Sequence, residues 1–185
     1  MESSHRSEIK EIENNTWKQT SSTVPSVSSQ ANQKRQQSYL GVYRLVVDTR
    51  KGAIVAKIRV VLADDHPEMI AEVRRTLDEE FEVIDSVDDG NQAVDAVMMM
   101  DADILVTDIS MPVLDGLQAA NRLRAVNSRV KIIFFTVHED RDYIAAALST
   151  GASGYVTKAR LKADLVHAIH EALRGNIFVS ELKPN

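Results

Sequence analysis

From residue 58 onward, the apolar and polar positions follow two alternating periods. Short runs of Val, Ile and Leu have the length of buried strands, and between them apolar residues recur every three or four positions, as in helices that pack one face on a core. The strand-like runs are 58–63, 81–87, 104–107, 130–136 and 154–156. The helix-like segments are 67–80, 90–100, 117–126, 141–149 and 161–173. Gly175 is typical of a helix C-terminus and predicts where the last helix ends.

Five strands that alternate with five helices predict a doubly wound α/β domain over residues 58–174, with a parallel sheet covered by helices on both faces. Right-handed crossovers leave few topologies for such a chain. In sheets of this kind the ligand site lies beyond the carboxyl ends of the strands. The functional question is therefore which residues follow each strand.

Charged and hydroxyl side chains stand at four of these strand ends. They are Asp64 and Asp65 after the first strand, Asp108 after the third, Thr136 at the end of the fourth and Lys158 just after the fifth. Each alone has an ordinary explanation, such as a solvated turn, a helix cap or a surface lysine. Their placement at successive strand ends favours one shared site.

This set of residue types suits phosphoryl transfer. Crowded carboxylates repel one another unless a cation neutralises them, and all-oxygen ligands select a hard ion such as Mg²⁺. An ionised Asp can act as the nucleophile and form an aspartyl phosphate without a protein base. A Lys ammonium and a Thr hydroxyl can bind the phosphoryl oxygens.

Residues 58–174 resemble the receiver domain of bacterial response regulators. The matching stretches are VLADDH (61–66), TDISMPVLDG (107–116), FT (135–136) and GASGYVTK (151–158). The DDH and GASGYVTK stretches are most similar to the branch that usually carries a C-terminal helix-turn-helix domain. The resemblance implies a flavodoxin-like, five-stranded parallel sheet with strand order 2-1-3-4-5.

The resemblance also implies the metal site. Asp108 is expected to be the phosphoacceptor and a Mg²⁺ ligand. Asp65 resembles the direct Mg²⁺ ligand, and Asp64 is expected to help, partly through water. The backbone carbonyl of Ser110 would be a further ligand.

Three further residues resemble the parts of a switch. Lys158 resembles the lysine that pairs with the acceptor and then with the phosphoryl group. Thr136 resembles the switch hydroxyl and Tyr155 the switch aromatic. The family's switch reshapes the face formed by the last strand and the last two helices, so phosphorylation is expected to act on an output through that face.

The implied partners are a sensor histidine kinase or phosphotransfer protein upstream, and a protein partner or a missing DNA-binding domain downstream. A homodimer that forms on phosphorylation is also possible by resemblance. The chain would modify its own Asp108 and turn over no separate substrate, so we expect it not to be an enzyme. The expected location is the cytoplasm.

Charge separates the chain into two parts. Residues 1–57 hold 9 Lys/Arg and 5 Asp/Glu, whereas residues 58–185 hold 13 and 22. The acidic folded part should repel phosphate backbones, so we expect no direct binding of nucleic acid. The chain has no cysteine, which excludes disulfides and thiolate metal sites. No apolar run approaches the roughly 20 residues of a membrane span, so no membrane insertion is expected.

The ends of the chain are less regular. Residues 1–57 are predicted to be a disordered or weakly structured extension, because 1–38 are mostly polar. Two apolar runs around 48–52 suggest a hairpin. Alternatively, a GUG codon at Val55 is the native start, which peptides from 1–54 in the native protein would contradict. Residues 175–185 are interpreted as a C-terminal tail or the start of a linker, so the chain is either a standalone receiver or a fragment of a regulator.

Two other functions were weighed against a phosphorylation-switched module. Phosphohydrolases that use an aspartyl phosphate typically have a second Asp two residues after the nucleophile, and that position here is Ser110. A degenerate receiver that acts as a constitutive interaction domain would have lost the acceptor, the acids or the lysine, and none is replaced. Both observations favour the switch.

Overall fold

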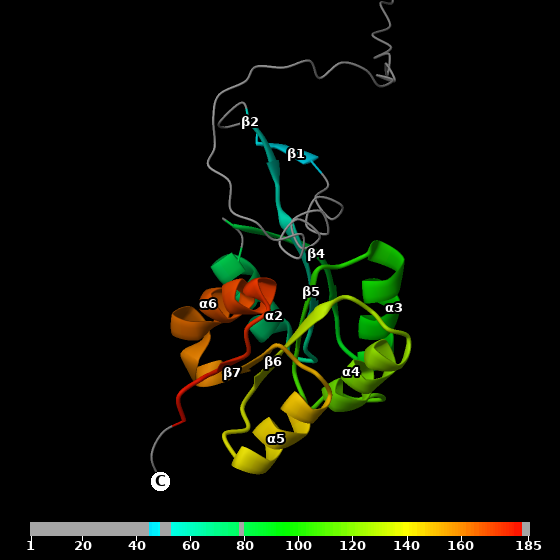
Figure 1. Ribbon diagram of the computed structural model, residues 1–185, viewed down its shortest axis with the longest axis vertical. Helices are drawn as coiled ribbons and strands as arrows, with labels where there is room; N and C mark the ends of the chain where they lie inside the picture. The colour runs from blue at the N-terminus through cyan, green and yellow to red at the C-terminus, as the bar shows by residue number, and fades with distance from the viewer. Residues whose placement is uncertain (1–44, 49–52, 78–79, 183–185) are drawn as a thin grey trace, which may run out of the picture. The chain divides into compact units, whose positions relative to one another are not determined.

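The computed structural model describes residues 45–48, 53–77 and 80–182 (Figure 1). The polar segment 1–38, predicted to be a tail, lies outside the described residues. Strands β1 (Leu45–Asp48) and β2 (Ala53–Ala56) pair antiparallel. This is the pairing that the hairpin interpretation predicts.

Six parallel strands form the main sheet, in the order β4-β3-β5-β6-β7-β8. Their bounds are β3 (Ile58–Ala63), β4 (Phe81–Val87), β5 (Ile104–Thr107), β6 (Lys131–Thr136), β7 (Gly154–Thr157) and β8 (Phe178–Val179). The first five correspond to the predicted strands and have the predicted order, which confirms the doubly wound, flavodoxin-like fold.

The sixth strand corrects the predicted count of five. β8 has only two residues, so it shows no alternation that could mark it as a strand. It pairs parallel to β7, with Phe178 opposite Gly154 and Val179 opposite Tyr155. The start of the predicted tail is therefore part of the sheet.

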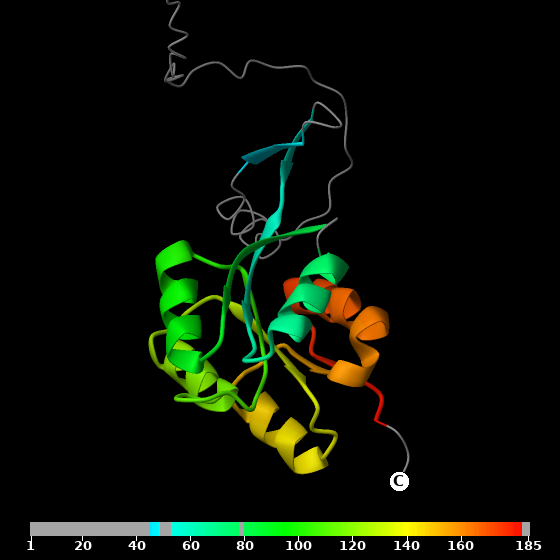
Figure 2. The ribbon, with the colours of Figure 1, turned by 180° about the vertical axis from the view of Figure 1, so that it is seen from behind.

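Helices cover both faces of this sheet, as Figures 1 and 2 show from opposite sides. Their bounds are α2 (Pro67–Leu77), α3 (Gly90–Met100), α4 (Gly116–Ala125), α5 (Arg141–Ser149) and α6 (Leu161–Arg174). α2 is described as far as Leu77, Glu80 lies in a turn, and the predicted helix residues 78–79 lie outside the described residues. α6 ends at Arg174, and Gly175, which follows it, has the left-handed φ of 86° that the prediction requires.

Two apolar clusters fill the space between the layers. One joins the sheet to α2 and α6 and includes Leu62 and Phe135. The other joins the opposite face to α3, α4 and α5 and includes Leu105 and Tyr155. Successive strand residues point to opposite faces, so each of the strands β3 to β7 contributes to both clusters. Burial on both faces explains why the strands are almost continuously apolar.

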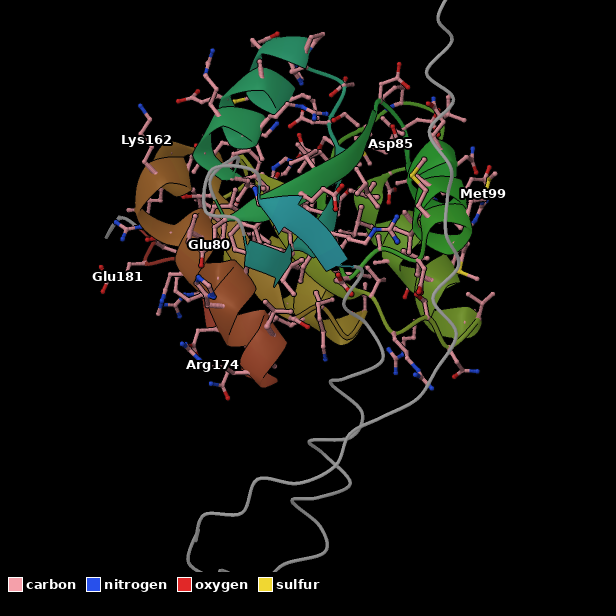
Figure 3. All side chains as sticks on the ribbon, turned by 90° about the horizontal axis from the view of Figure 1, so that it is seen from above. Glu80, Asp85, Met99, Lys162, Arg174 and Glu181 are labelled. Carbon is pink, nitrogen blue, oxygen red and sulfur yellow. The ribbon has the colours of Figure 1, made fainter. Side chains whose placement is uncertain are left out.

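The outward side chains of α6 include basic residues, whereas those of α3 include methionines. In Figure 3, Lys162 and Arg174 point away from α6, and Met99 points away from α3 on the other side of the sheet. Met99 is 85% exposed, and Met98 and Met100 are exposed as well. The buried face of α3 is formed instead by Gly90, Ala93, Ala96 and Val97.

Candidate functional site

The carboxyl ends of the central strands bring the predicted charged residues together. Asp64 follows the last residue of β3, Asp108 follows β5, and Lys158 follows β7. Their position is fixed by the parallel register, in which Ala63 lies opposite Thr107, and by a hydrogen bond from the Asp108 N–H to the Ala63 carbonyl of 2.8 Å. The strand ends therefore form one acidic rim that receives a lysine.

Asp108 is buried, with 3% of its surface exposed. Its Oδ1 accepts hydrogen bonds from the backbone N–H groups of Ile109, at 2.6 Å, and Ser110, at 3.4 Å. Its Oδ2 accepts one from Lys158 Nζ at 2.7 Å. All of these donors stabilise the charged carboxylate, which is the form that can attack an electrophile.

Lys158 connects two carboxylates. Its Nζ lies 2.7 Å from Oδ2 of Asp108 and 2.7 Å from Oδ2 of Asp64. Burial favours the neutral amine and lowers the pKa of Lys158, but the hydrogen bonds that its ammonium donates to Asp108 and Asp64 outweigh burial, so the pKa lies above its ordinary value. Lys158 is thus a fixed positive charge beside the acceptor.

Asp65 and His66 complete the rim on its exposed side. The Nδ1 atom of His66 lies 3.0 Å from Oδ1 of Asp64 and 2.9 Å from Oδ1 of Asp65. The hydrogen bond with Asp64 and the charge of Asp65 raise the pKa of His66. Sequence reasoning used His66 only for the family resemblance and missed this contact, although its place directly after the two acids was the available signal.

The rim has the donors that a metal ion requires. One ligand atom from each of Asp64, Asp65, His66 and Asp108 can be chosen so that all lie within 4.8 Å of one another. Three of these are carboxylate oxygens, which suit a hard divalent cation. The Ser110 carbonyl accepts no hydrogen bond from the described residues, so its oxygen is free for a ligand. The donor set therefore fits Mg²⁺.

Thr136 and Tyr155 belong to neighbouring strands beside the rim, and neither hydroxyl makes a hydrogen bond with Asp108. Both are fully buried. The Thr136 hydroxyl accepts from the His138 N–H at 3.5 Å, and the Tyr155 hydroxyl donates to the His138 carbonyl at 2.9 Å. Burial, with a smaller contribution from the charge of Asp108, raises the pKa of Tyr155, so its hydroxyl stays protonated and can donate.

His138 joins the two loops that border the acceptor. Its Nε2 lies 2.9 Å from the Ser110 hydroxyl, and its ring stacks on Tyr143 with centroids 3.9 Å apart. The sequence alone gives no sign of these two partners. The arrangement links the acceptor loop to the first turn of α5.

Residues 60–170 match the family model of the response regulator receiver domain. The match covers more than half of the chain and includes the whole acidic rim. The chain belongs to this family. As a receiver domain, it is part of a two-component system, the class of signalling pathway in which response regulators act.

Curated relatives agree with this assignment. The receiver is 34% identical over 125 residues to the transcriptional regulatory protein DegU of Brevibacillus brevis, covering 66% of this chain and 53% of DegU. It is 33% identical over 115 residues to the chemotaxis protein CheY of Halobacterium salinarum, covering 62% of this chain and 96% of CheY. The chain spans about half the length of DegU and of the similar nitrate/nitrite regulator NarL of Escherichia coli.

Solved structures have the same fold. The receiver domain of a putative NarL from Mycobacterium tuberculosis matches with a TM-score of 0.62 and 29% identity, over 65% of this chain and 98% of that domain. A LuxR-family response regulator from Aurantimonas matches with a TM-score of 0.63 and 31% identity, over 66% of this chain and 89% of the other. These similarities confirm the predicted family and its transcription-regulator branch.

None of the helices in the described part of the chain is both long enough and apolar enough to cross a bilayer. The amphipathic helices of the receiver instead pack their apolar faces on the sheet.

Proposed function

We propose that this receiver accepts a phosphoryl group on Asp108 and uses it to change the face formed by α5, β7 and α6. The observation that carries the proposal is the position of Lys158, whose ammonium lies 2.7 Å from the carboxylates of both Asp64 and Asp108. A buried cation shared by an acceptor and a metal-binding acid is well placed to bind an incoming anion.

In the proposed transfer, an oxygen of the Asp108 carboxylate attacks phosphorus, and the bond from phosphorus to the donor atom breaks. The electron pair of that bond leaves with the donor, which is a phosphohistidine of a sensor kinase or phosphotransfer protein, or a small phosphodonor. Asp108 is ionised before the attack, so no protein base is needed. The product is an aspartyl phosphate.

The neighbouring residues then bind the transferred group. Mg²⁺, held by Asp64, Asp65, Asp108 and the Ser110 carbonyl, would supply charge neutralisation for the phosphoryl oxygens. The Lys158 ammonium donates to a second oxygen of the group. The Thr136 hydroxyl leaves the His138 N–H to donate to a third, and this exchange of partners is the proposed first step of the switch.

Tyr155 would carry the change to the surface. Its hydroxyl donates to the His138 carbonyl, so a movement of His138 with Thr136 alters the position of that acceptor. The affected face is proposed to control a protein partner or an attached DNA-binding domain, or to form a homodimer. The described receiver itself is not proposed to bind nucleic acid, because its acidic balance disfavours phosphate backbones.

The test is treatment of the purified protein with acetyl phosphate and Mg²⁺, followed by electrophoresis on a phosphate-affinity gel. Wild type and Asp95→Asn should give a retarded band, since Asp95 is an exposed residue of α3 outside the rim. Asp108→Asn and chelation of Mg²⁺ should each abolish it. A folded wild type without the band, or a band that persists in Asp108→Asn, would contradict the proposal. The first outcome would favour a constitutive interaction domain.

A further inference from the structure

The segment after α6 is hydrogen-bonded to α6 and to the sheet between Asn176 and Ser180. The Asn176 N–H donates to the Glu171 carbonyl at 2.9 Å, the Phe178 N–H to the Ser153 carbonyl at 3.1 Å, and the Ser180 N–H to the Tyr155 carbonyl at 2.8 Å. The Phe178 ring meets His167 edge-on at 5.2 Å. Residues 176–180 are thus an integral edge of the receiver, next to the strand that carries Tyr155.

Ser180 ends this segment in a buried polar network. The residue is 2% exposed. Its hydroxyl donates to Oδ2 of Asp164 at 2.6 Å and accepts from the Thr157 N–H at 3.4 Å. Asp164, which is 5% exposed, also binds Arg160 through both carboxylate oxygens, at 2.6 Å and 3.0 Å. One hydroxyl therefore joins the end of β7 to the first turn of α6.

These contacts lie on both sides of Lys158 in the chain. Thr157 precedes Lys158, and the short 3-10 helix η1 (Lys158–Arg160) begins with Lys158 and ends with Arg160. The Lys158 Nζ must lie 2.7 Å from two carboxylates at once, so a shift of its backbone would move the flexible side chain away from one of them. The Ser180 hydroxyl and the Asp164–Arg160 pair hold that backbone from both ends.

We propose that Ser180, acting through Asp164 and Arg160, is a positioning residue that keeps Lys158 on Asp64 and Asp108. The role in phosphoryl transfer rests on the proposed function, whereas the positioning of the ammonium does not. Ser180 lies beyond the residues 60–170 that match the family model, so the segment after α6 contributes to the site from outside that match.

The coupling acts in both directions. If docking of 176–180 helps to hold Lys158, then movement of Lys158 toward a phosphoryl group changes the docking of 176–180 by the same free energy. Residues that follow Ser180 would sense the state of Asp108 through this edge of the sheet. The connection runs through β7 and η1 and needs no contact between the segment and the acceptor.

The first measurement follows the Lys158 ammonium by NMR in ¹⁵N-labelled protein at constant pH, without phosphodonor. The wild type should give a slowly exchanging ammonium signal, because Nζ is buried between two carboxylates. Ser180→Ala should broaden or shift it, and Ser180→Thr, which keeps the hydroxyl, should restore it at least in part. Ser149→Ala is the matched control, because it removes an exposed hydroxyl that donates only to the Ala146 carbonyl in the same helix, α5.

The second measurement is the rate of phosphorylation by acetyl phosphate in the same variants. A misplacement of a catalytic group by about 1 Å can slow a reaction roughly 100-fold. The loss of the Ser180 hydroxyl should shift Lys158 by less, so Ser180→Ala should slow the reaction about 3-fold to 10-fold. Ser149→Ala should match wild type. An unchanged Lys158 signal in Ser180→Ala would overturn the inference, as would equal loss of signal in Ser149→Ala. A wild type that is not phosphorylated would refute the proposed function, and the signal comparison would still decide the positioning role.

Discussion

The two loops that border the acceptor are held in different ways. The loop after β5 (108–116) is tied by its backbone: the Gly116 N–H donates to the Ile109 carbonyl at 2.9 Å, and the Leu114 carbonyl accepts from the Gly90 N–H at 2.9 Å. Residues 137–139, after β6, show no backbone-to-backbone hydrogen bond within the described part of the chain. They are held by side chains, through the bonds of Thr136 and Tyr155 to His138.

The helices that follow these loops differ in the same way. α4 buries Gly116, Ala119, Ala120 and Leu123, whereas α5 buries Ala147 alone. Buried apolar contacts and backbone bonds raise the free energy of local opening, so the acceptor side should be rigid and the Thr136 side easier to displace. A switch needs both properties, because a fixed acceptor must act on a movable element.

The largest expected effect tests the rigid loop. A Cβ at Gly116 would lie 2.0 Å from the Asp108 carbonyl oxygen, a backbone atom that cannot move aside without distorting the acceptor. Gly116→Ala should therefore destabilise the protein by about 3 kcal/mol, measured by urea unfolding. Gly151→Ala meets no atom within 4 Å but has φ of 87°, so it should cost only about 1 kcal/mol. If both variants lost the same free energy of unfolding, the close approach of Gly116 to the Asp108 carbonyl would not be what holds this loop.

A second prediction concerns the segment after β7, which charged side chains hold. The hydrogen bond from Arg160, helped by that from Ser180, lowers the pKa of Asp164 below its ordinary value of 3.8. A depressed pKa stabilises the fold above 3.8, and this contribution is lost as the pH falls through the folded-state pKa. Asp164→Asn should cost about 2 kcal/mol at neutral pH. The free energy of unfolding, measured against pH, should differ less between wild type and Asp164→Asn in acid than at neutral pH. A difference that does not change with pH would contradict the charge-based account.

The smallest effect tests the movable loop. Tyr155→Phe removes the hydroxyl that donates to the His138 carbonyl and should cost about 1 kcal/mol. Tyr143→Phe is the matched control, because that ring stacks on His138 but its hydroxyl makes no hydrogen bond with a described residue. The amide of His138 should exchange faster with solvent in Tyr155→Phe than in Tyr143→Phe. Identical exchange in the two variants would show that the Tyr155 hydroxyl does not restrain the loop.

The sequence predicted the layers of this fold because a strand that is buried on both faces needs a nearly uninterrupted apolar run, such as 58–63 or 104–107. It predicted the residues of the rim because chain order and parallel topology together fix where strand ends lie. Elements that depend on a neighbour were missed. β8 exists because β7 offers an open edge, and two residues such as Phe178 and Val179 carry no periodic signal of that.

Contacts between side chains were the least predictable part of the site. Ser110 and His138 are 28 positions apart, and their 2.9 Å contact depends on the course of two loops that hydrophobic periodicity does not describe. The role of Ser180 depends on Asp164 in the same way. Residue type does not identify these partners, and only the folded arrangement shows them.

The most direct test of a fixed acceptor loop and a movable Thr136 loop is a comparison of amide NMR spectra before and after acetyl phosphate and Mg²⁺. The account predicts large chemical-shift changes for the amides of Val137 and His138 and small ones for those of Leu114 and Gly116. In Asp108→Asn, none of the four amides should change. The amides of Ile109 and Ser110 are set aside because they bond directly to the acceptor. Changes at Leu114 and Gly116 as large as those at Val137 and His138 would contradict it.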